Sequence, residues 1–325
     1  MTYEKETLGK LLSDERIAPV AADAIRNRDL RDEPVWNMTL GTISKERFFT
    51  GQIHKGIDRL YRAADTGEWY YPLYNEKECS EDHARDGVSV VWLPSDEAGA
   101  DDRPFILIIP GGGFVNVWNL TEGWPVAEKF NRLGYHVFVL TYQVDGDRLF
   151  EKNMQDISRA LVFIKNNEKR FHLDGDRYIT CGFSAGGYLL CLWNTEKGYL
   201  CYDLPKPQAS FPVYPVTGLC VEDPGDPEER ENIRYMCGCE MEEALGSAYE
   251  TTQHAEHFPP CAFFLAADDE LVSPDNSKNL AAALEKHGIP CRLEIAPAGG
   301  HGFADGTGTD MAGWTERAVK WYESL

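Results

Sequence analysis

Through most of the chain, short apolar runs alternate with segments long enough to form helices. The runs PFILIIP (104–110), YHVFVLTY (135–142) and RYITCGF (177–183) are largely apolar, which is typical of strands buried on both faces. Residues 149–168, between the second and third runs, carry apolar side chains at helical spacing. Because parallel strands need crossover connections of this length, the alternation predicts an α/β fold with a mostly parallel, doubly wound sheet.

The same alternation extends on both sides of these three runs. Further strands are predicted at 88–94, 208–215, 261–268 and 291–297, and further helices at 122–133, from Ala185 onward, at 275–288 and at 310–324.

Two segments depart from the alternation. Residues 1–75 contain no strand-like apolar run, so we expect a helical N-terminal arm outside the sheet, which caps a pocket or forms a homo-oligomer contact. Its predicted helices cover 8–12, 20–28 and 56–64. Residues 76–325 then form the α/β domain. Residues 218–257 begin with an acidic, proline-bearing run and are too long for a simple connection, which predicts a lid-like insertion.

The charge of the chain disfavours several kinds of partner. It carries 32 lysines and arginines against 53 aspartates and glutamates, a formal net charge of −21. Such a surface repels phosphate backbones and anionic lipid headgroups, so we expect neither a nucleic acid nor a membrane as partner. The first residues contain no apolar h-region and no stretch of about 18 apolar residues follows, so we expect neither a signal peptide nor a membrane span. The nine cysteines are scattered and odd in number, which favours reduced thiols and a cytoplasmic location.

Two short patterns hint at a metal ion, and neither has support. Cys237 and Cys239 are spaced like half of a zinc site, but no second Cys/His pair follows at zinc spacing. His254 and His257 are three residues apart without an accompanying carboxylate pattern. We therefore expect no metal and no cofactor.

One serine lies where a buried strand should end and a helix should begin. In the sequence GFSAGG, Ser184 has glycines two positions before and two positions after it. A strand-to-helix reversal this short brings those two positions together, so Gly182 and Gly186 are the residues that it requires. We interpret Ser184 as a nucleophile on a strained turn, in preference to a serine in a flexible loop.

A nucleophilic serine needs a base and an acid that orients the base. His301 follows the last predicted strand in the glycine-rich loop GGHGF, and it is the candidate base. The candidate acids follow the strand CAFFLAA, where Asp269 is preferred and Asp268 is the alternative. A carboxylate just past one strand can meet a histidine on the exit loop of the next strand.

Donors for the oxyanion are expected after the strand 104–110. Gly112 and Gly113 allow the backbone to approach a substrate closely, and their N–H groups would act with that of Ala185 at a helix N-terminus. A phosphate-binding loop is the competing interpretation. No Lys-Ser/Thr follows the glycines, and Asn116 interrupts the G-x-G-x-x-G pattern, so nucleotide binding is disfavoured.

These motifs resemble the α/β-hydrolase superfamily, and within it the small carboxylesterases typified by acetyl xylan esterases and related feruloyl or acetyl esterases. The resemblance runs from about residue 87 to 325 and rests on PGGGF, EGWPVAEKFNRLGYHVFVLTY, GFSAGG, PPCAFFLAADDELVSP and GGHGF, in that order. The order serine, aspartate, histidine is that of an α/β-hydrolase triad, and the Val272 that follows favours Asp269 over Asp268. Where the family often has histidine before the glycines, this chain has Pro110, so the support of that loop is expected to differ.

The resemblance implies a serine esterase whose partner is a small ester, with a short acyl group on a carbohydrate. Phe114, Trp118 and Trp124 are the candidate substrate-binding residues, since sugar rings stack on aromatic faces, although such residues also commonly serve only to pack the fold. Three alternatives stay open at this point: a peptidase of the same fold, a hydrolase of lipid esters, and a non-catalytic binding protein of hydrolase fold.

Overall fold

The computed structural model describes residues 5–21, 26–27, 37–42, 52–67 and 69–325, and all structural statements below concern these residues. An eight-stranded sheet with the order β10-β9-β8-β7-β4-β6-β3-β2 forms its centre. The strands are β2 (Tyr70–Pro72), β3 (Ser89–Leu93), β4 (Phe105–Ile109), β6 (Val137–Thr141), β7 (Tyr178–Phe183), β8 (Ala209–Val213), β9 (Cys261–Ala266) and β10 (Cys291–Ala296).

Six of the eight strands are parallel, as the sequence predicted. Strands β6, β4, β7, β8, β9 and β10 run in one direction, whereas β3 is antiparallel to β6 and β2 is antiparallel to β3. Every residue of β4, β6 and β7 is buried. Burial on both faces explains why these strands appear in the sequence as continuous apolar runs.

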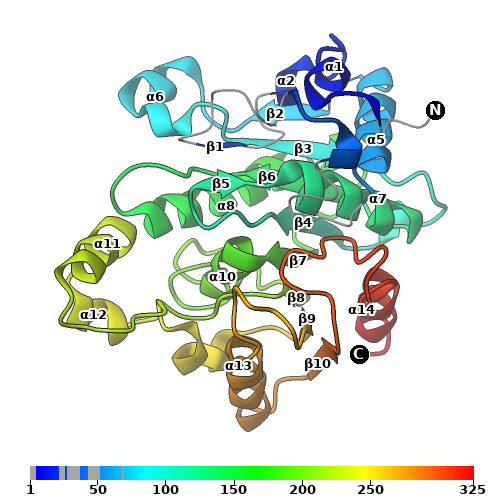
Figure 1. The fold of residues 1–325 in the computed structure, drawn as a ribbon. Coiled ribbons are helices and arrows are strands. Elements are labelled where there is room, and N and C mark those ends of the chain that lie inside the picture. Colours follow the sequence, from blue (N-terminus) through cyan, green and yellow to red (C-terminus); the bar gives the residue numbers. More distant parts are fainter. Residues whose placement is uncertain (1–4, 22–25, 28–36, 43–51, 68) are drawn as a thin grey trace.

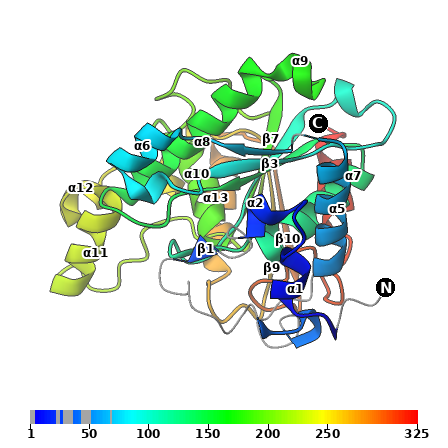
Figure 2. The ribbon, with the colours of Figure 1, turned by 90° about the horizontal axis from the view of Figure 1, so that it is seen from above.

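Helices cover both faces of the sheet. The principal ones are α5 (Ile53–Asp65), α7 (Trp124–Arg132), α8 (Leu149–Asn166), α10 (Ser184–Trp193), α13 (Asp275–Lys286) and α14 (Trp314–Tyr322). The other α-helices are α1 (Leu8–Leu12), α2 (Ala18–Ala21), α6 (Glu76–Glu81), α9 (Glu168–Phe171), α11 (Pro227–Cys237) and α12 (Met241–Leu245). Figures 1 and 2 show α5, α7 and α14 on one side of the sheet and α8, α10 and α13 on the other. The predicted doubly wound α/β fold is confirmed.

The direction of winding changes at β4, which lies between β6 and β7. The chain moves from β4 to β6 through α7, and then returns past β4 to β7 through α8. Because crossovers are right-handed, these two opposite steps put α7 and α8 on opposite faces of the sheet. Ligands of doubly wound sheets bind beyond the carboxyl ends of the strands at such a switch point.

The prediction that residues 1–75 stay outside the central sheet was wrong for one strand, and a second short strand replaces part of a predicted helix. Strand β2 adds to the edge of the sheet beside β3, and its three residues are too few to show as an apolar run. Arg26–Asn27 (β1) pairs with Asn116–Val117 (β5) in a separate two-stranded sheet, although 20–28 was predicted as a helix. Residues 22–25 and 28 of that predicted helix lie outside the described residues. The predicted helices at 8–12 and 56–64 are found as α1 and α5.

Helix α5 is part of the core and not an appended element. It packs closely on α7, where a Cβ at Gly56 would lie only 2.8 Å from the backbone nitrogen of Pro125. Ile57 and Leu60 of the same helix are completely buried. The close approach explains why glycine occupies a helix interior, where it is otherwise unfavourable.

The segment 218–257 contains α11, α12 and a 3-10 turn over Thr251–His257. Asp226 caps α11 and Pro227 begins it, so the proline-bearing acidic run is a helix start. In both views α11 and α12 lie at one end of the molecule, next to α8.

In the part of the chain that the structure describes, no helix is both long and apolar enough to span a bilayer. All nine cysteines lie in that part, and each has a free thiol.

The packing of α5 leads to a prediction about stability. We expect Leu60→Ala to lower the free energy of unfolding by about 2–4 kcal/mol, because it opens a cavity between α5 and the sheet. Urea denaturation measures this change. Arg62→Ala, on the exposed side of the same helix, is the control and should stay within about 0.5 kcal/mol of the wild type. Equal effects of the two substitutions would contradict a core role for α5.

Candidate active site

Ser184 lies on a strained turn between β7 and α10. Its φ of 50° is in the left-handed region, which a serine adopts only when its surroundings enforce it. A Cβ at Gly182 would lie 2.6 Å from the carbonyl oxygen of Gly186. A Cβ at Gly186 would collide with the carbonyl oxygens of Ile109 and Pro110 at the end of β4. The expected steric role of the two glycines is confirmed.

Three polar side chains from three strand ends meet beside this turn. His301 Nε2 lies 2.9 Å from Ser184 Oγ, and His301 Nδ1 lies 2.8 Å from Asp269 Oδ2. An ionised carboxylate only accepts hydrogen bonds, so Nδ1–H donates to Asp269 and leaves the lone pair of Nε2 to accept from the serine hydroxyl. The Asp269 side chain is 1% exposed and that of His301 is 16% exposed. The acid is therefore buried, whereas the imidazole is partly open to solvent.

The two candidate acids have different partners. Asp269 Oδ1 accepts hydrogen bonds of 2.9 Å from the backbone N–H groups of Leu271 and Val272, which orients its other oxygen toward His301. Asp268 Oδ1 accepts from Gly300 N–H at 2.8 Å. The structure therefore brings Asp269 to the imidazole, while Asp268 ties the loop that carries the imidazole.

The glycine loop after β4 presents unused donors beside Ser184. The carbonyl of Gly111 accepts from Trp118 N–H and that of Gly112 accepts from Asn116 N–H. Within the described residues, no acceptor is found for the N–H groups of Gly112, Gly113 and Ala185. Unpaired N–H groups next to a nucleophile are the donors that an oxyanion requires.

A buried carboxylate supports the loop from below, and the sequence analysis missed it. Glu122 Oε2 accepts from Gly111 N–H at 2.6 Å, and Glu122 Oε1 accepts from Tyr214 Oη at 2.9 Å. The Tyr214 ring contacts the imidazole of His301 with 4.7 Å between ring centroids. Burial raises the pKa of Glu122, and the two hydrogen bonds oppose that shift. A glutamate in a predicted helix gives no sign of burial, so the sequence offered no signal for this role.

Two cavities meet at Ser184, and both also contact Gly113 and Leu271. The first, here called the histidine-side cavity, has a volume of about 550 Å³ and is lined by Trp118, Glu270 and His301.

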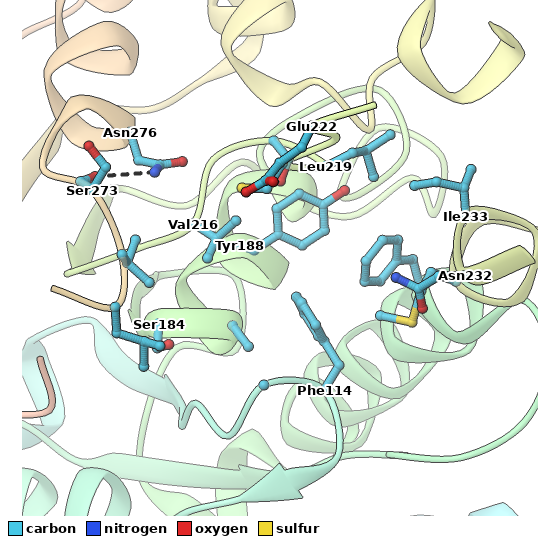
Figure 3. Close-up of a pocket in the computed structure, with 18 residues that line it drawn as sticks. Phe114, Ser184, Tyr188, Val216, Leu219, Glu222, Asn232, Ile233, Ser273 and Asn276 are labelled. Carbon is cyan, nitrogen blue, oxygen red and sulfur yellow. Dashed lines mark hydrogen bonds between the residues drawn. The ribbon is translucent and has the colours of Figure 1, made fainter. Parts of the chain in front are cut away.

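The second cavity, here called the insertion-side cavity, has a volume of about 560 Å³. Phe114, Tyr188 and Leu219 line it together with Ile233 and Asn232 of α11. Figure 3 shows Ser184 at one end of this cavity and Asn232 and Ile233 of α11 at the other end. The rings of Phe114 and Tyr188 lie between the two ends. The 218–257 segment thus forms part of a cavity wall next to Ser184.

The three predicted substrate-binding aromatics have different positions. Phe114 lines the insertion-side cavity and Trp118 lines the histidine-side cavity. The prediction for Trp124 was wrong, because its side chain is completely buried in α7. A position in a predicted helix does not reveal which side of that helix faces the core.

Among the described residues, no group of three or more histidine, cysteine, aspartate or glutamate side chains could hold a metal ion. His254 instead pairs with Glu196 at 2.9 Å. Cys237 is buried, and burial raises the pKa of its thiol.

The six parallel strands, the strained serine turn after β7, the aspartate after β9 and the histidine after β10 define the fold as that of an α/β hydrolase. The family model BD-FAE matches residues 91–284. The chain belongs to the BD-FAE family.

Related proteins and structures agree with this assignment. The chain is 28% identical over 224 residues to endo-1,4-beta-xylanase B of Butyrivibrio fibrisolvens, which covers 66% of this chain and 34% of the xylanase. It is 26% identical over 228 residues to an acetylxylan esterase of Xylanibacter ruminicola, covering 67% of this chain and 44% of the esterase. The chain therefore spans less than half the length of either relative.

Among solved structures, the acetyl ester-xyloside bifunctional hydrolase from Caldicellulosiruptor lactoaceticus superposes with a TM-score of 0.64 and 27% identity, over 78% of this chain and 95% of that chain. The carboxylesterase Cest-2923 from Lactobacillus plantarum WCFS1 gives a TM-score of 0.59 and 25% identity, over 73% and 92% of the two chains.

The buried position of Glu122 leads to a second stability prediction. We expect Glu122→Ala to lower the free energy of unfolding by about 2–4 kcal/mol, because it leaves the buried donors of Gly111 and Tyr214 unpaired. Glu270→Ala removes an exposed carboxylate from the same cavity and is the matched control, with an expected change of about 0.5 kcal/mol or less. Urea denaturation of both variants measures the difference, and similar losses would contradict the role of Glu122.

Proposed function

We propose that the chain is a serine esterase that hydrolyses short-chain acyl esters of carbohydrates, acetylated xylo-oligosaccharides among them. The observation that carries the proposal is the pair of hydrogen bonds from Asp269 through His301 to Ser184, at the meeting point of two cavities. The carbohydrate part is supported by the relatives, whose names include an acetylxylan esterase and a xylanase.

In this proposal Ser184 Oγ attacks the ester carbonyl while His301 Nε2 takes its proton. Asp269 holds the imidazole in the tautomer that this step needs and stabilises the imidazolium. The N–H groups of Gly112, Gly113 and Ala185 donate to the oxyanion of the tetrahedral intermediate. His301 then protonates the leaving alcohol, and a water molecule activated by the same imidazole releases the acyl group from the serine.

The substrate side is supported by Trp118, whose ring lines the cavity that contains His301 and is suited to pack on a sugar ring. The acidic character of the chain favours a neutral ester over an anionic one. A cytoplasmic location is part of the proposal and is supported by nine free thiols, which persist in a reducing compartment. A homo-oligomer contact through the N-terminal arm stays a prediction.

The proposal is tested by acetate release from acetylated xylo-oligosaccharides, measured beside a simple aryl acetate. We expect Ser184→Ala to lower kcat by about 10³-fold or more, because the nucleophile is lost while both cavities remain. Circular dichroism establishes that the variant is folded. A kcat close to that of the wild type would overturn the assignment of Ser184.

The neighbouring aspartates allow a matched test of the acid. We expect Asp269→Asn to lower kcat by about 10³- to 10⁴-fold, because an amide favours the wrong tautomer of His301. Asp268→Asn changes the same atoms one residue away, where the carboxylate accepts from the Gly300 N–H and not from the imidazole, so its kcat should fall by less than about tenfold. Steady-state kinetics on the aryl acetate compare the two, and a larger loss in the Asp268 variant would reverse the assignment.

A further inference from the structure

The two cavities beside Ser184 differ in one respect that bears on the chemistry: only the histidine-side cavity is lined by His301. In the reaction proposed above, the imidazole that takes the serine proton must give it to the oxygen of the leaving alcohol. That oxygen therefore has to lie on the side of His301. The acyl group of the same ester then extends the other way, past Ala185, which lines only the insertion-side cavity.

The insertion-side cavity has a largely apolar middle. Phe114 and Phe150 pack edge to face with 5.1 Å between ring centroids, and the rings of Phe114 and Tyr188 are 5.7 Å apart. The Tyr188 hydroxyl donates to the carbonyl of Tyr249 at 3.0 Å. Because this hydroxyl is already bonded, Tyr188 contributes mainly its ring to the cavity, which favours an apolar ligand.

Helix α11 of the 218–257 segment closes the far end. Ile233 is 4% exposed and Met236 is 9% exposed, and both line the cavity. Figure 3 shows Ile233 and Asn232 at the end opposite Ser184, with Phe114 between these two residues and the serine. The exposed carboxylate of Glu222 also lines this cavity, which disfavours an acyl group that carries a negative charge.

The size of this cavity exceeds what an acetyl group needs. Its volume of about 560 Å³ lies in the range of sites for ligands of many heavy atoms. An acetyl group held on Ser184 has one methyl group beyond the carbonyl carbon, so it ends close to the serine and leaves the region near α11 to water. Each further methylene placed against the apolar wall would improve binding roughly fourfold.

We propose that the insertion-side cavity is the acyl site and that it selects neutral, apolar acyl groups several carbons longer than acetyl, with Ile233 of α11 setting the length. The histidine-side cavity then holds the alcohol, beside Trp118 and the carboxylates of Asp268 and Glu270. This inference rests on the proposed esterase function. Acetyl esters are hydrolysed at the same site, but they are not its best substrates.

The test compares kcat/KM on p-nitrophenyl acetate, hexanoate and decanoate. We expect the wild type to prefer hexanoate over acetate by about tenfold or more. Ile233→Trp fills the far end and should reduce the hexanoate-to-acetate ratio by about tenfold. Glu231→Trp puts the same side chain on an exposed position of α11, and its ratio should equal that of the wild type. Ile233→Ala enlarges the cavity, so it should raise the decanoate-to-hexanoate ratio and serves if the tryptophan variant does not fold.

A second series varies the alcohol, from methyl to hexyl acetate. Ile233→Trp should leave the preference among these alcohols unchanged. If the substitution changed the preference among alcohols but not among acyl groups, the assignment of the two cavities would be overturned. The assignment would also be overturned if the wild type preferred acetate and both Ile233 variants kept the wild-type ratios of kcat/KM between acyl esters. In that case, hydrolysis that depends on Ser184 would still support the esterase proposal. Hydrolysis that persists in Ser184→Ala would instead refute the esterase proposal itself.

Discussion

The rest of the site depends on the close approach of two backbones where β4 and β7 end side by side. A Cβ on Gly186 would collide with the carbonyl oxygens of Ile109 and Pro110, and a Cβ on Gly111 would lie 2.9 Å from the Cβ of Ser184. The glycine loop and the serine turn therefore interlock, and neither Gly111 nor Gly186 has room for a side chain. This contact brings the unpaired N–H groups of the loop next to the serine, and it is set by the parallel pairing of β4 with β7.

The interlocked ends are joined to the histidine loop through a buried carboxylate. Glu122 accepts from the loop after β4 and from Tyr214 after β8, and the Tyr214 hydroxyl also accepts from Ala304 N–H at 3.3 Å. Tyr214 itself has a φ of 37°, which costs free energy. A buried, hydrogen-bonded network of this kind holds separate loops in one arrangement. It supports the loop that follows Pro110.

Much of the fold follows from local patterns. The central strands appear as apolar runs because both faces of the sheet are covered. The helices between them appear as apolar residues at helical spacing, because one side of each helix faces the sheet. Predictions from the sequence were wrong where the local pattern was too short or did not have the period of the element that forms. Strand β2 has three residues at an edge and is held by pairing with β3, and Arg26–Asn27 pairs with a distant strand. Trp124 was predicted to bind substrate, although its side chain is completely buried in the core.

By itself, the sequence determined which residues lie at strand ends, since the apolar runs and the glycines around Ser184, His301 and Gly112 mark those positions. It also determined the order of the serine, the aspartate and the histidine along the chain. The sequence favoured Asp269 over Asp268, but only the tertiary structure shows which carboxylate reaches the imidazole, because that depends on the backbone N–H groups that orient each one. The tertiary structure likewise decided that the segment 218–257 closes one of two cavities, since the walls of a cavity come from elements far apart in the chain.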